Sequence, residues 1–255
     1  MRAVRTEKPG PYLRFCVILI YPLTSLLWRR RWRGADRIPR QGPAILAINH
    51  ISYADPFVIG RFMWDAGRLP RFLAKAALFR LPLLGRIVRG AGQIPVYRGT
   101  ADANQALAAA VKALQRGEIV LVYPEGTVTR DPQFWPMQAK SGVARLALLA
   151  PDVPVIPVGQ WGSQYFLDFY ARKFRPIPRR TMTVSVGQPL DLSGYRGREP
   201  TADLLHEMTD AIMRQVRLQV AAIRAELPPE DFYPRPEGVG ARAKDAARPD
   251  KRESA

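Results

Sequence analysis

The sequence predicts an α/β fold in which a mixed sheet is flanked by helices. Short apolar runs of strand length alternate with longer helical patterns from about residue 42 to residue 226. The chain has 255 residues, of which 47% are apolar, so it can bury a substantial core. These two observations favour one α/β domain, which we place at residues 34–228, with shorter segments at both ends.

The expected strands are apolar runs bounded by turn residues. AILAI and IVLVY are apolar throughout, which is typical of strands that are buried on both faces of a sheet. The predicted strands are residues 44–48, 94–97, 119–123, 153–158 and 181–186.

The expected helices follow these strands. The clearest runs from about Asp102 to Arg116, where apolar residues recur on one helical face and Gly117 ends the pattern. Asp55 and Pro56 suit the start of another helix. Further helices are predicted at about residues 142–149 and 201–226, and a further apolar segment at 78–88.

Residues 1–33 are predicted to form a helical membrane-associating element. The uncharged stretch after Arg14 ends at Arg29 and is shorter than the roughly 20 apolar residues that a spanning helix needs. Pro22 is expected to kink or divide it. The following WRRRWR places indoles beside cations, as a membrane interface favours. We therefore expect a segment that dips into the membrane; the alternative is a helix packed on the domain's own core.

The charge balance limits the partners. The formal net charge is +17, which favours polyanions such as nucleic acid, an anionic membrane surface or phosphorylated substrates. The aromatic-spaced basic patterns of nucleic-acid-binding modules do not occur, so we predict no nucleic-acid partner. One cysteine, Cys16, cannot form an intrachain disulfide, and one Cys with two His excludes an ordinary Cys/His zinc site, which leaves a metal bound by carboxylates as the open alternative. Residues 229–255 are rich in Pro, Gly, Ala and charge, and we expect them to be disordered.

The stretch NHISYAD combines a histidine with an aspartate at the end of an expected strand. Ligands of α/β proteins bind at the carboxyl ends of strands, so His50 should face that crevice. Asp55 alone is adequately explained as a helix cap, but the intervening turn lets it reach back to His50. An aspartate that fixes one imidazole nitrogen leaves the other free to accept a proton.

A protein nucleophile for this pair is missing from the sequence. The G-x-S-x-G pattern does not occur, Ser52 is too close to His50 to assign, and Cys16 lies in the N-terminal segment. The simplest interpretation is that His50 deprotonates a hydroxyl of the substrate, so that a group passes directly onto an alcohol.

Two further clusters follow strands. In YPEGTVTR, the Gly126 and Thr127 amides could meet an anion, and Glu125 could accept from a hydroxyl or hold an arginine. In IPVYRGT, Arg98 lies between a strand and a helix, where it could grip a phosphate. Taken singly, these are equally well explained as a turn and a surface arginine.

Together the clusters strongly resemble the glycerolphospholipid acyltransferase family. Its four motifs stand here in family order as NHISYAD, IPVYRG, YPEGT and VPVIPVG, between about Asn49 and Gly159. The resemblance implies an α/β domain beside an N-terminal membrane-binding element at the cytoplasmic face of the cell membrane, peripheral or monotopic. It implies transfer of an acyl group from acyl-CoA or acyl carrier protein to lysophosphatidic acid, with no other cofactor and no metal.

The resemblance also implies residue roles. His50 is then the general base and Asp55 orients it, while Arg98, Glu125, Gly126 and Thr127 hold the glycerol phosphate. Lys75 and Arg130 are further candidates for substrate binding. Lys75, in LAKAALF, stands where members of the family often have a lysine before an apolar loop, and Arg130 is the next arginine after the YPEGT motif.

This sequence departs from the family at one position. Many members have an arginine directly after the threonine of the third motif, where this chain has Val128 and places its arginine at Arg130. A glycolipid or another lysolipid acceptor therefore stays open, as does a thioesterase that uses the same pair on water. A non-catalytic basic protein is the third alternative. The segment 131–142 is expected to face lipid or to pack in the core, and His206 to be structural or exposed.

Overall fold

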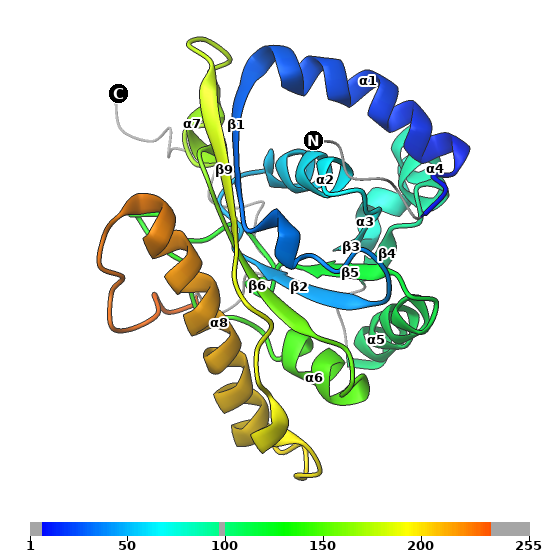
Figure 1. Cartoon of the computed structure of the whole chain (residues 1–255), viewed down its shortest axis with the longest axis vertical. Helices are drawn as coiled ribbons and strands as arrows, with labels where there is room; N and C mark the ends of the chain where they lie inside the picture. The colour runs from blue at the N-terminus through cyan, green and yellow to red at the C-terminus, as the bar shows by residue number, and fades with distance from the viewer. Residues whose placement is uncertain (1–6, 97–99, 236–255) are drawn as a thin grey trace, which may run out of the picture.

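The computed structural model describes residues 7–96 and 100–235. Its centre is a seven-stranded sheet with the order β1-β9-β6-β2-β5-β3-β4 (Figure 1). Strands β6, β2, β5, β3 and β4 are parallel, β9 is antiparallel to β6, and β1 is parallel to β9, so the predicted mixed sheet is confirmed. The strands are β1 Trp28–Arg33, β2 Ala44–Ile48, β3 Pro70–Lys75, β4 Ile94–Val96, β5 Ile119–Val122, β6 Val155–Trp161 and β9 Arg180–Val186.

Helices cover both faces of this sheet (Figure 1). On one face lies α2, with α1 outside it; α5, α6 and α8 cover the other face. A separate two-stranded ribbon, β7 with β8, follows the short helix α7. The α-helices are α1 Pro11–Leu27, α2 Asp55–Asp65, α3 Ala76–Phe79, α4 Pro82–Gly90, α5 Thr100–Gln115, α6 Gly142–Leu149, α7 Ser163–Phe166 and α8 Ala202–Arg224; β7 is Leu167–Asp168 and β8 is Lys173–Phe174.

The sheet separates two hydrophobic cores. Successive residues of β2 point to opposite faces, so Leu46 and Ile48 pack towards α2 while Ile45 and Ala47 pack towards α5, α6 and α8. All five residues of β2 are fully buried. A central strand that is covered on both sides is therefore the frame from which the loop after Ile48 projects.

The arginine-rich WRRRWR segment corrects the predicted domain boundary at residue 33. It forms β1, an edge strand whose residues Trp28–Arg33 pair in register with Arg180–Ser185 of β9. Its arginines are exposed, while Trp28 is buried and packs edge-on against Phe166 with ring centroids 5.2 Å apart. Charged side chains are tolerated on an edge strand because one side faces water. The sheet therefore begins at Trp28.

Helix α1 is continuous although Pro22 lies inside it, so of the two expected effects of Pro22, a kink or a division, the division does not occur. It packs on the domain through few residues, chiefly Leu13 and Thr24, and leaves a row of large apolar side chains exposed. No helix in the described part of the chain is both long and apolar enough to cross a bilayer.

The start of the C-terminal segment is ordered, contrary to the prediction for residues 229–255. Tyr233 bridges to Met137, and its carbonyl accepts from the Gln138 amide at 3.0 Å. Phe232 lies under the guanidinium of Arg217, 4.3 Å from its carbon. Aromatic side chains thus dock residues up to 235 on the domain; residues 236–255 lie outside the described part.

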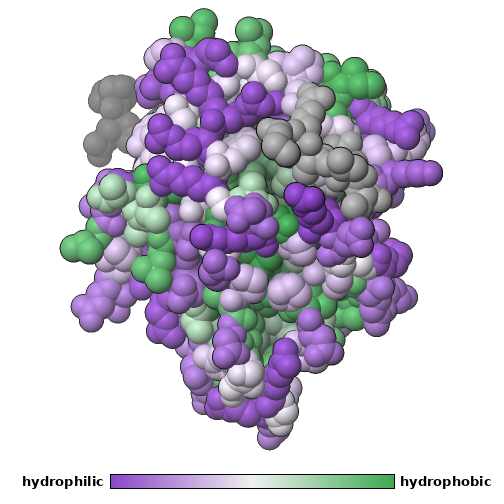
Figure 2. Space-filling view, viewed as in Figure 1, coloured by the Kyte–Doolittle hydropathy of each residue, from purple (hydrophilic) through white to green (hydrophobic). Residues whose placement is uncertain are grey.

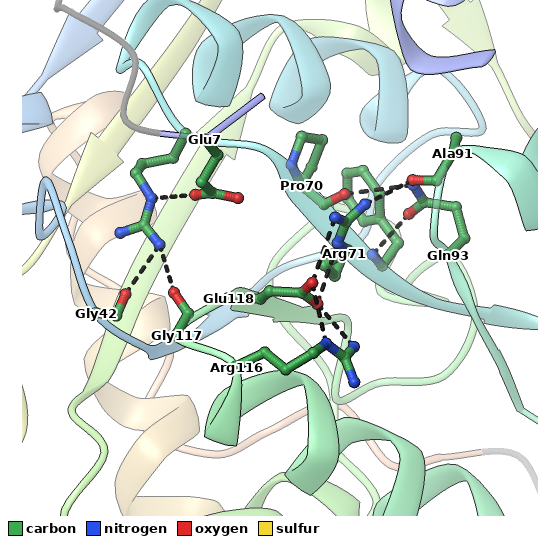
Figure 3. Close-up of polar contacts among 11 residues, drawn as sticks. Glu7, Gly42, Pro70, Arg71, Ala91, Gln93, Arg116, Gly117 and Glu118 are labelled. Carbon is green, nitrogen blue, oxygen red and sulfur yellow. Dashed lines mark hydrogen bonds and ion pairs between the residues drawn. The ribbon is translucent and has the colours of Figure 1, made fainter. Parts of the chain in front are cut away.

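A polar network holds the edge of the sheet where the parallel strands begin (Figure 3). Arg68 is 1% exposed and donates to the carbonyls of Gly42 and Gly117, each at 2.9 Å, and to the Glu7 carboxylate. Nearby, Arg71 pairs with Glu118 at 3.2 Å. One buried guanidinium therefore joins the segment before α1 to the loops that precede β2 and β5.

We expect Arg68→Met to lower the free energy of unfolding by about 3 kcal/mol, because it leaves buried carbonyls and a carboxylate without their donor. Urea unfolding measures this loss. Arg116→Met is the matched control, since Arg116 pairs with Glu118 at the same edge but its side chain is 60% exposed; its effect should stay below about 1 kcal/mol. Equal losses in both variants would contradict the assignment.

Candidate active site

The predicted site residues gather at the opposite edge, where the parallel strands end. His50 comes two residues after β2, and Lys75 is the last residue of β3. Tyr123 directly follows β5, and Glu125 comes two residues later. Because β2, β3 and β5 are parallel neighbours, their carboxyl ends meet at this edge, as the sequence predicted.

His50 and Asp55 form a direct pair. Nδ1 of His50 lies 2.7 Å from Oδ2 of Asp55, and the two side chains are 14% and 0% exposed. A carboxylate at Nδ1 favours the tautomer that carries its proton there, which leaves Nε2 able to accept a proton. The predicted contact between the two residues is therefore present in the structure.

Asp55 does not act as the helix cap that its sequence position suggests. The N-cap of α2 is Ala54, and the Asp55 side chain turns back into the preceding loop. Its Oδ2 accepts from the amides of Ile51 and Ser52 at 2.7 and 2.9 Å, and its Oδ1 accepts from the Ser163 hydroxyl. These donors compensate for the burial of the carboxylate.

The backbone of the histidine loop is held on both sides. The His50 amide donates to Oε1 of Glu125 at 2.8 Å, and the His50 carbonyl accepts from the Thr129 amide at 2.7 Å. Asn49 and Gln160 exchange three hydrogen bonds of 2.7–3.1 Å, which join the loop to the end of β6. The loops after three neighbouring strands thus fix the position of the imidazole.

Glu125 lies beneath the His50 loop and bonds to its backbone. It is fully buried, and its second oxygen accepts from the Met137 amide at 3.1 Å. Burial raises the pKa of Glu125 from 4.5 to about 8, against the opposing effect of the amides of His50 and Met137. Because Glu125 holds the His50 amide from inside the fold, it fixes the position of the His50 backbone; direct contact with the acceptor stays a prediction.

Tyr123 forms one wall of the site. Its ring stacks on the His50 imidazole with centroids 4.4 Å apart and planes inclined by 24°. Burial and the nearby Asp55 charge raise the pKa of Tyr123 well above 10, so the phenol stays neutral. The aromatic face therefore limits rotation of the imidazole without adding a charge.

The other predicted binding residues differ in what the structure says of them. Gly126 has φ +70°, a conformation that glycine adopts without strain, and forms the tight turn expected after β5. Thr127 follows it, and Lys75 is exposed at the same edge. The Cζ atom of Arg130 lies 6.0 Å from the Tyr170 ring centroid. Arg98 lies outside the described residues.

Two of the three large apolar residues in the segment after the third motif pack in the core, which favours the core alternative for them. Trp135 and Met137 are 3% and 0% exposed. Phe134 packs edge-on against Trp161, with centroids 6.4 Å apart. Val128, at the position where many relatives have an arginine, is fully buried. The second histidine, His206, is 66% exposed on α8, as expected.

Sequence reasoning missed several residues around the pair. Gln160 lies at the end of β6 and Ser163 at the start of α7, both more than 100 residues after His50. Lys140 lies over the Gly126 turn, its side chain 3.6 Å from the position that a Cβ of Gly126 would take. A strand-exit rule applied to β6 as well as β2 and β5 would have pointed to Gln160 and Ser163, since β6 pairs with β2.

The arrangement suits proton abstraction from a bound hydroxyl. Among the described residues, no serine or cysteine donates to His50, and no group of three or more His, Cys, Asp or Glu side chains could hold a metal ion. A histidine paired with a carboxylate in this way can take a proton from a bound hydroxyl, which is the chemistry of base-assisted group transfer.

The comparisons with known proteins name the family. The Acyltransferase family model matches residues 29–161, just over half of the chain, so the chain belongs to this family. The 1-acyl-sn-glycerol-3-phosphate acyltransferase of Bacillus subtilis is 22% identical over 80% of this chain and 94% of its own length. The 1-acyl-sn-glycerol-3-phosphate acyltransferase of Limnanthes douglasii is 31% identical over 73% of this chain and 66% of its own length. The chain is thus an O-acyltransferase of this family.

Two further similarities concern the fold and the acceptor. The crystal structure of the 1-acyl-sn-glycerophosphate acyltransferase of Thermotoga maritima has the same fold, with a TM-score of 0.60, 21% identity and coverage of 85% of this chain and 81% of that one. The lyso-ornithine lipid O-acyltransferase of Pseudomonas aeruginosa is 33% identical over 49% of this chain and 45% of its own length.

The raised pKa of Glu125 predicts a pH dependence of stability. The folded protein keeps a proton on Glu125 up to about pH 8, whereas the unfolded chain releases it near 4.5. Between pH 4.5 and about pH 8 the folded state therefore binds more protons than the unfolded state. The contribution of Glu125 to the free energy of unfolding falls as the pH rises through this range.

Urea unfolding of wild type and Glu125→Gln at pH 5, 6.5 and 8 tests this. The glutamine cannot ionise, so the decline should be reduced in E125Q even if its overall stability is lower. Glu199→Gln, at an exposed position, is the matched control and should keep the wild-type decline. The same slope in E125Q as in wild type would show that Glu125 does not carry a raised pKa.

Proposed function

We propose that this acyltransferase moves a fatty acyl group from an acyl thioester to the free hydroxyl of lysophosphatidic acid, giving phosphatidic acid. The observation that carries the proposal is the pair formed by His50 and the buried Asp55, with Nδ1 and Oδ2 2.7 Å apart in the loop after β2. The relatives from Bacillus subtilis and Limnanthes douglasii are 1-acyl-sn-glycerol-3-phosphate acyltransferases, which supports this acceptor.

The proposed reaction is a direct transfer with balanced proton movements. Nε2 of His50 takes the proton of the acceptor hydroxyl as its oxygen attacks the thioester carbonyl carbon. The tetrahedral intermediate then collapses, the carbon–sulfur bond breaks, and the thiolate receives the proton from Nε2. Asp55 stabilises the imidazolium that exists between these two transfers and does not itself take up a proton.

The side chains near the pair support a nucleophile that belongs to the substrate. Ser52 is fully buried and donates its hydroxyl to the Leu167 carbonyl at 2.7 Å. Cys16 lies in α1, and partial burial raises the pKa of its thiol, which disfavours the reactive thiolate. Neither residue is therefore placed for attack on a thioester.

Cations at the same edge suit an anionic acceptor. Lys75 and Lys140 are exposed there, Lys140 over the Gly126 turn and Lys75 at the end of β3. In β3, Lys75 pairs with Val96 of β4, two residues before Arg98. We propose that these cations, with Arg130 and the Gly126–Thr127 amides, hold the acceptor phosphate.

A lyso-ornithine lipid is a second candidate acceptor. The Pseudomonas aeruginosa relative with that activity in its name is 33% identical over about half of this chain. Val128, which is fully buried, stands where many members of the family have an arginine, so the third motif has one cation fewer in this chain. The acceptor headgroup is therefore a variable to be tested against lysophosphatidic acid.

We also propose that the exposed face of α1 rests on the cytoplasmic surface of the membrane, without crossing it. Figure 2 shows apolar side chains protruding at the upper rim of the molecule, where α1 lies. Arginines exposed beside this row suit anionic headgroups. The exposed apolar residues of α1 are Tyr12, Phe15, Ile18, Leu19, Leu23 and Leu26, and neighbouring α4 adds Leu83 and Leu84.

Changing His50 tests the chemistry. His50→Ala should reduce acyl transfer from a labelled acyl-CoA or acyl carrier protein to lysophosphatidic acid by at least about 100-fold, the usual effect of losing a general base. His206→Ala is the matched control, since His206 is exposed on α8 and should leave the rate unchanged. Far-ultraviolet circular dichroism checks that both variants are folded.

The outcomes separate the alternatives. Acceptor-dependent phosphatidic acid that disappears in H50A supports the proposal. Thioester loss without an acceptor favours the hydrolase, and transfer to lyso-ornithine lipid alone favours the second acceptor. Substantial transfer to lysophosphatidic acid by a folded H50A protein contradicts the role of His50.

Charges on the exposed face of α1 test the membrane proposal. The variant Ile18→Glu/Leu26→Glu should release the protein from vesicles of anionic phospholipid in a flotation assay, because it removes apolar contacts and adds repulsion. Leu149→Glu/Leu227→Glu adds the same charge at exposed leucines in α6 and after α8 and should leave flotation unchanged. Full binding of the α1 variant would exclude this face.

A further inference from the structure

Asp55 receives hydrogen bonds from two different parts of the fold. Three of its donors, His50 Nδ1 and the amides of Ile51 and Ser52, belong to its own loop and all meet Oδ2. The donor to Oδ1 is the hydroxyl of Ser163, 108 positions away in sequence, at 2.5 Å. The second carboxylate oxygen is therefore fixed from outside the loop.

Ser163 is itself held rigidly. It is the first residue of α7, two residues beyond β6, and β6 pairs with β2 through Val158 and Ile48. The intervening Gly162 has φ +108°, and a Cβ there would lie 2.1 Å from the Thr181 carbonyl oxygen. Only glycine allows this close turn against β9. The turn directs the Ser163 side chain, which is 1% exposed, towards Asp55.

We propose that Ser163 is a positioning residue for the base of the proposed acyl transfer, acting on His50 through Asp55. A carboxylate bound at one oxygen alone can rotate about its Cβ–Cγ bond, whereas a carboxylate bound at both oxygens keeps one orientation. The Ser163 hydroxyl holds Oδ1, so Oδ2 stays aligned with Nδ1 of His50. The hydroxyl also stabilises the negative charge of Asp55 and so moderates its attraction for the imidazolium.

A role for Ser163 as nucleophile does not fit this geometry. Its hydroxyl donates to Asp55 and not to His50, and its side chain is closed to solvent. In a serine nucleophile the hydroxyl donates to the histidine that removes its proton. Ser163 therefore acts at one remove from the reacting atoms.

The test compares Ser163→Ala with wild type in full pH profiles of kcat and kcat/KM for acyl transfer to lysophosphatidic acid. Loss of one charge-assisted hydrogen bond should lower kcat by about tenfold, with KM for both substrates within about twofold of wild type. The acidic limb of kcat/KM should move to higher pH, because a carboxylate without this donor favours the protonated imidazole more strongly. The other titratable groups around His50, Tyr123 and Glu125, are unchanged in this variant.

Two further variants keep the test decisive. Ser185→Ala removes a buried hydroxyl from β9 that bonds to Gln219 at 2.9 Å, away from Asp55, and should leave kcat and the pH profile unchanged. Ser163→Cys keeps a weak donor and should show the same changes with smaller amplitude, which covers the case in which S163A does not fold.

The inference is overturned if folded S163A or S163C keeps the wild-type kcat and acidic limb. It is also overturned if the loss of activity merely follows a loss of folded protein, with an unmoved pH profile. Its failure is distinguishable from failure of the proposed function. An inactive H50A together with a fully active S163A refutes only the role of Ser163, whereas an active H50A refutes the proposed chemistry itself.

Discussion

The hydrogen bond between Asp55 and His50 is the interaction on which the rest of the site depends. Burying a carboxylate is unfavourable unless donors replace the water that it loses. Asp55 is fully buried and has four such donors, three from its own loop and one from Ser163. These donors come together only while the ends of β2 and β6 and the start of α2 remain in their present positions, so the site depends on the fold around it.

The same principle extends outward from the pair. Glu125 and Asn49 are polar and fully buried, and each is joined to backbone groups of the neighbouring strand exits. Three adjacent parallel strands, β5, β2 and β6, therefore end in one connected polar layer. Tyr123 closes this layer with an aromatic face. The exposed cations lie outside it, where an anionic acceptor can reach them without entering the core.

The sequence predicted the elements whose local pattern agrees with their environment. Residues 44–48 and 142–149 are a strand and a helix with the predicted bounds, because each is apolar in a way that only one structure explains. β1 was missed because an arginine-rich segment can form a strand only at the edge of a sheet, which is a property of the whole fold. The start of the C-terminal segment was missed because two aromatic residues suffice to dock it.

For the site, the sequence predicted what lies within one loop and missed what crosses between loops. The spacing of His50 and Asp55 sufficed to predict their contact. The hydrogen bonds from Ser163 and Gln160 depend on the register of β6 against β2, which no local pattern encodes. The burial of Glu125 likewise follows from the packing of the segment around Met137, so its motif could not show that it faces inward.

The most direct test of the account is whether the acyl group ever becomes attached to the protein. Wild-type enzyme in stoichiometric amounts would be mixed with an acyl thioester and no acceptor, quenched on the millisecond-to-minute scale, and examined by intact-mass spectrometry alongside thiol release. The account predicts an unmodified chain and thiol release that begins only when lysophosphatidic acid is added, because the acceptor hydroxyl is the nucleophile. A chain heavier by one acyl group, with one equivalent of thiol released before any acceptor is present, would contradict it.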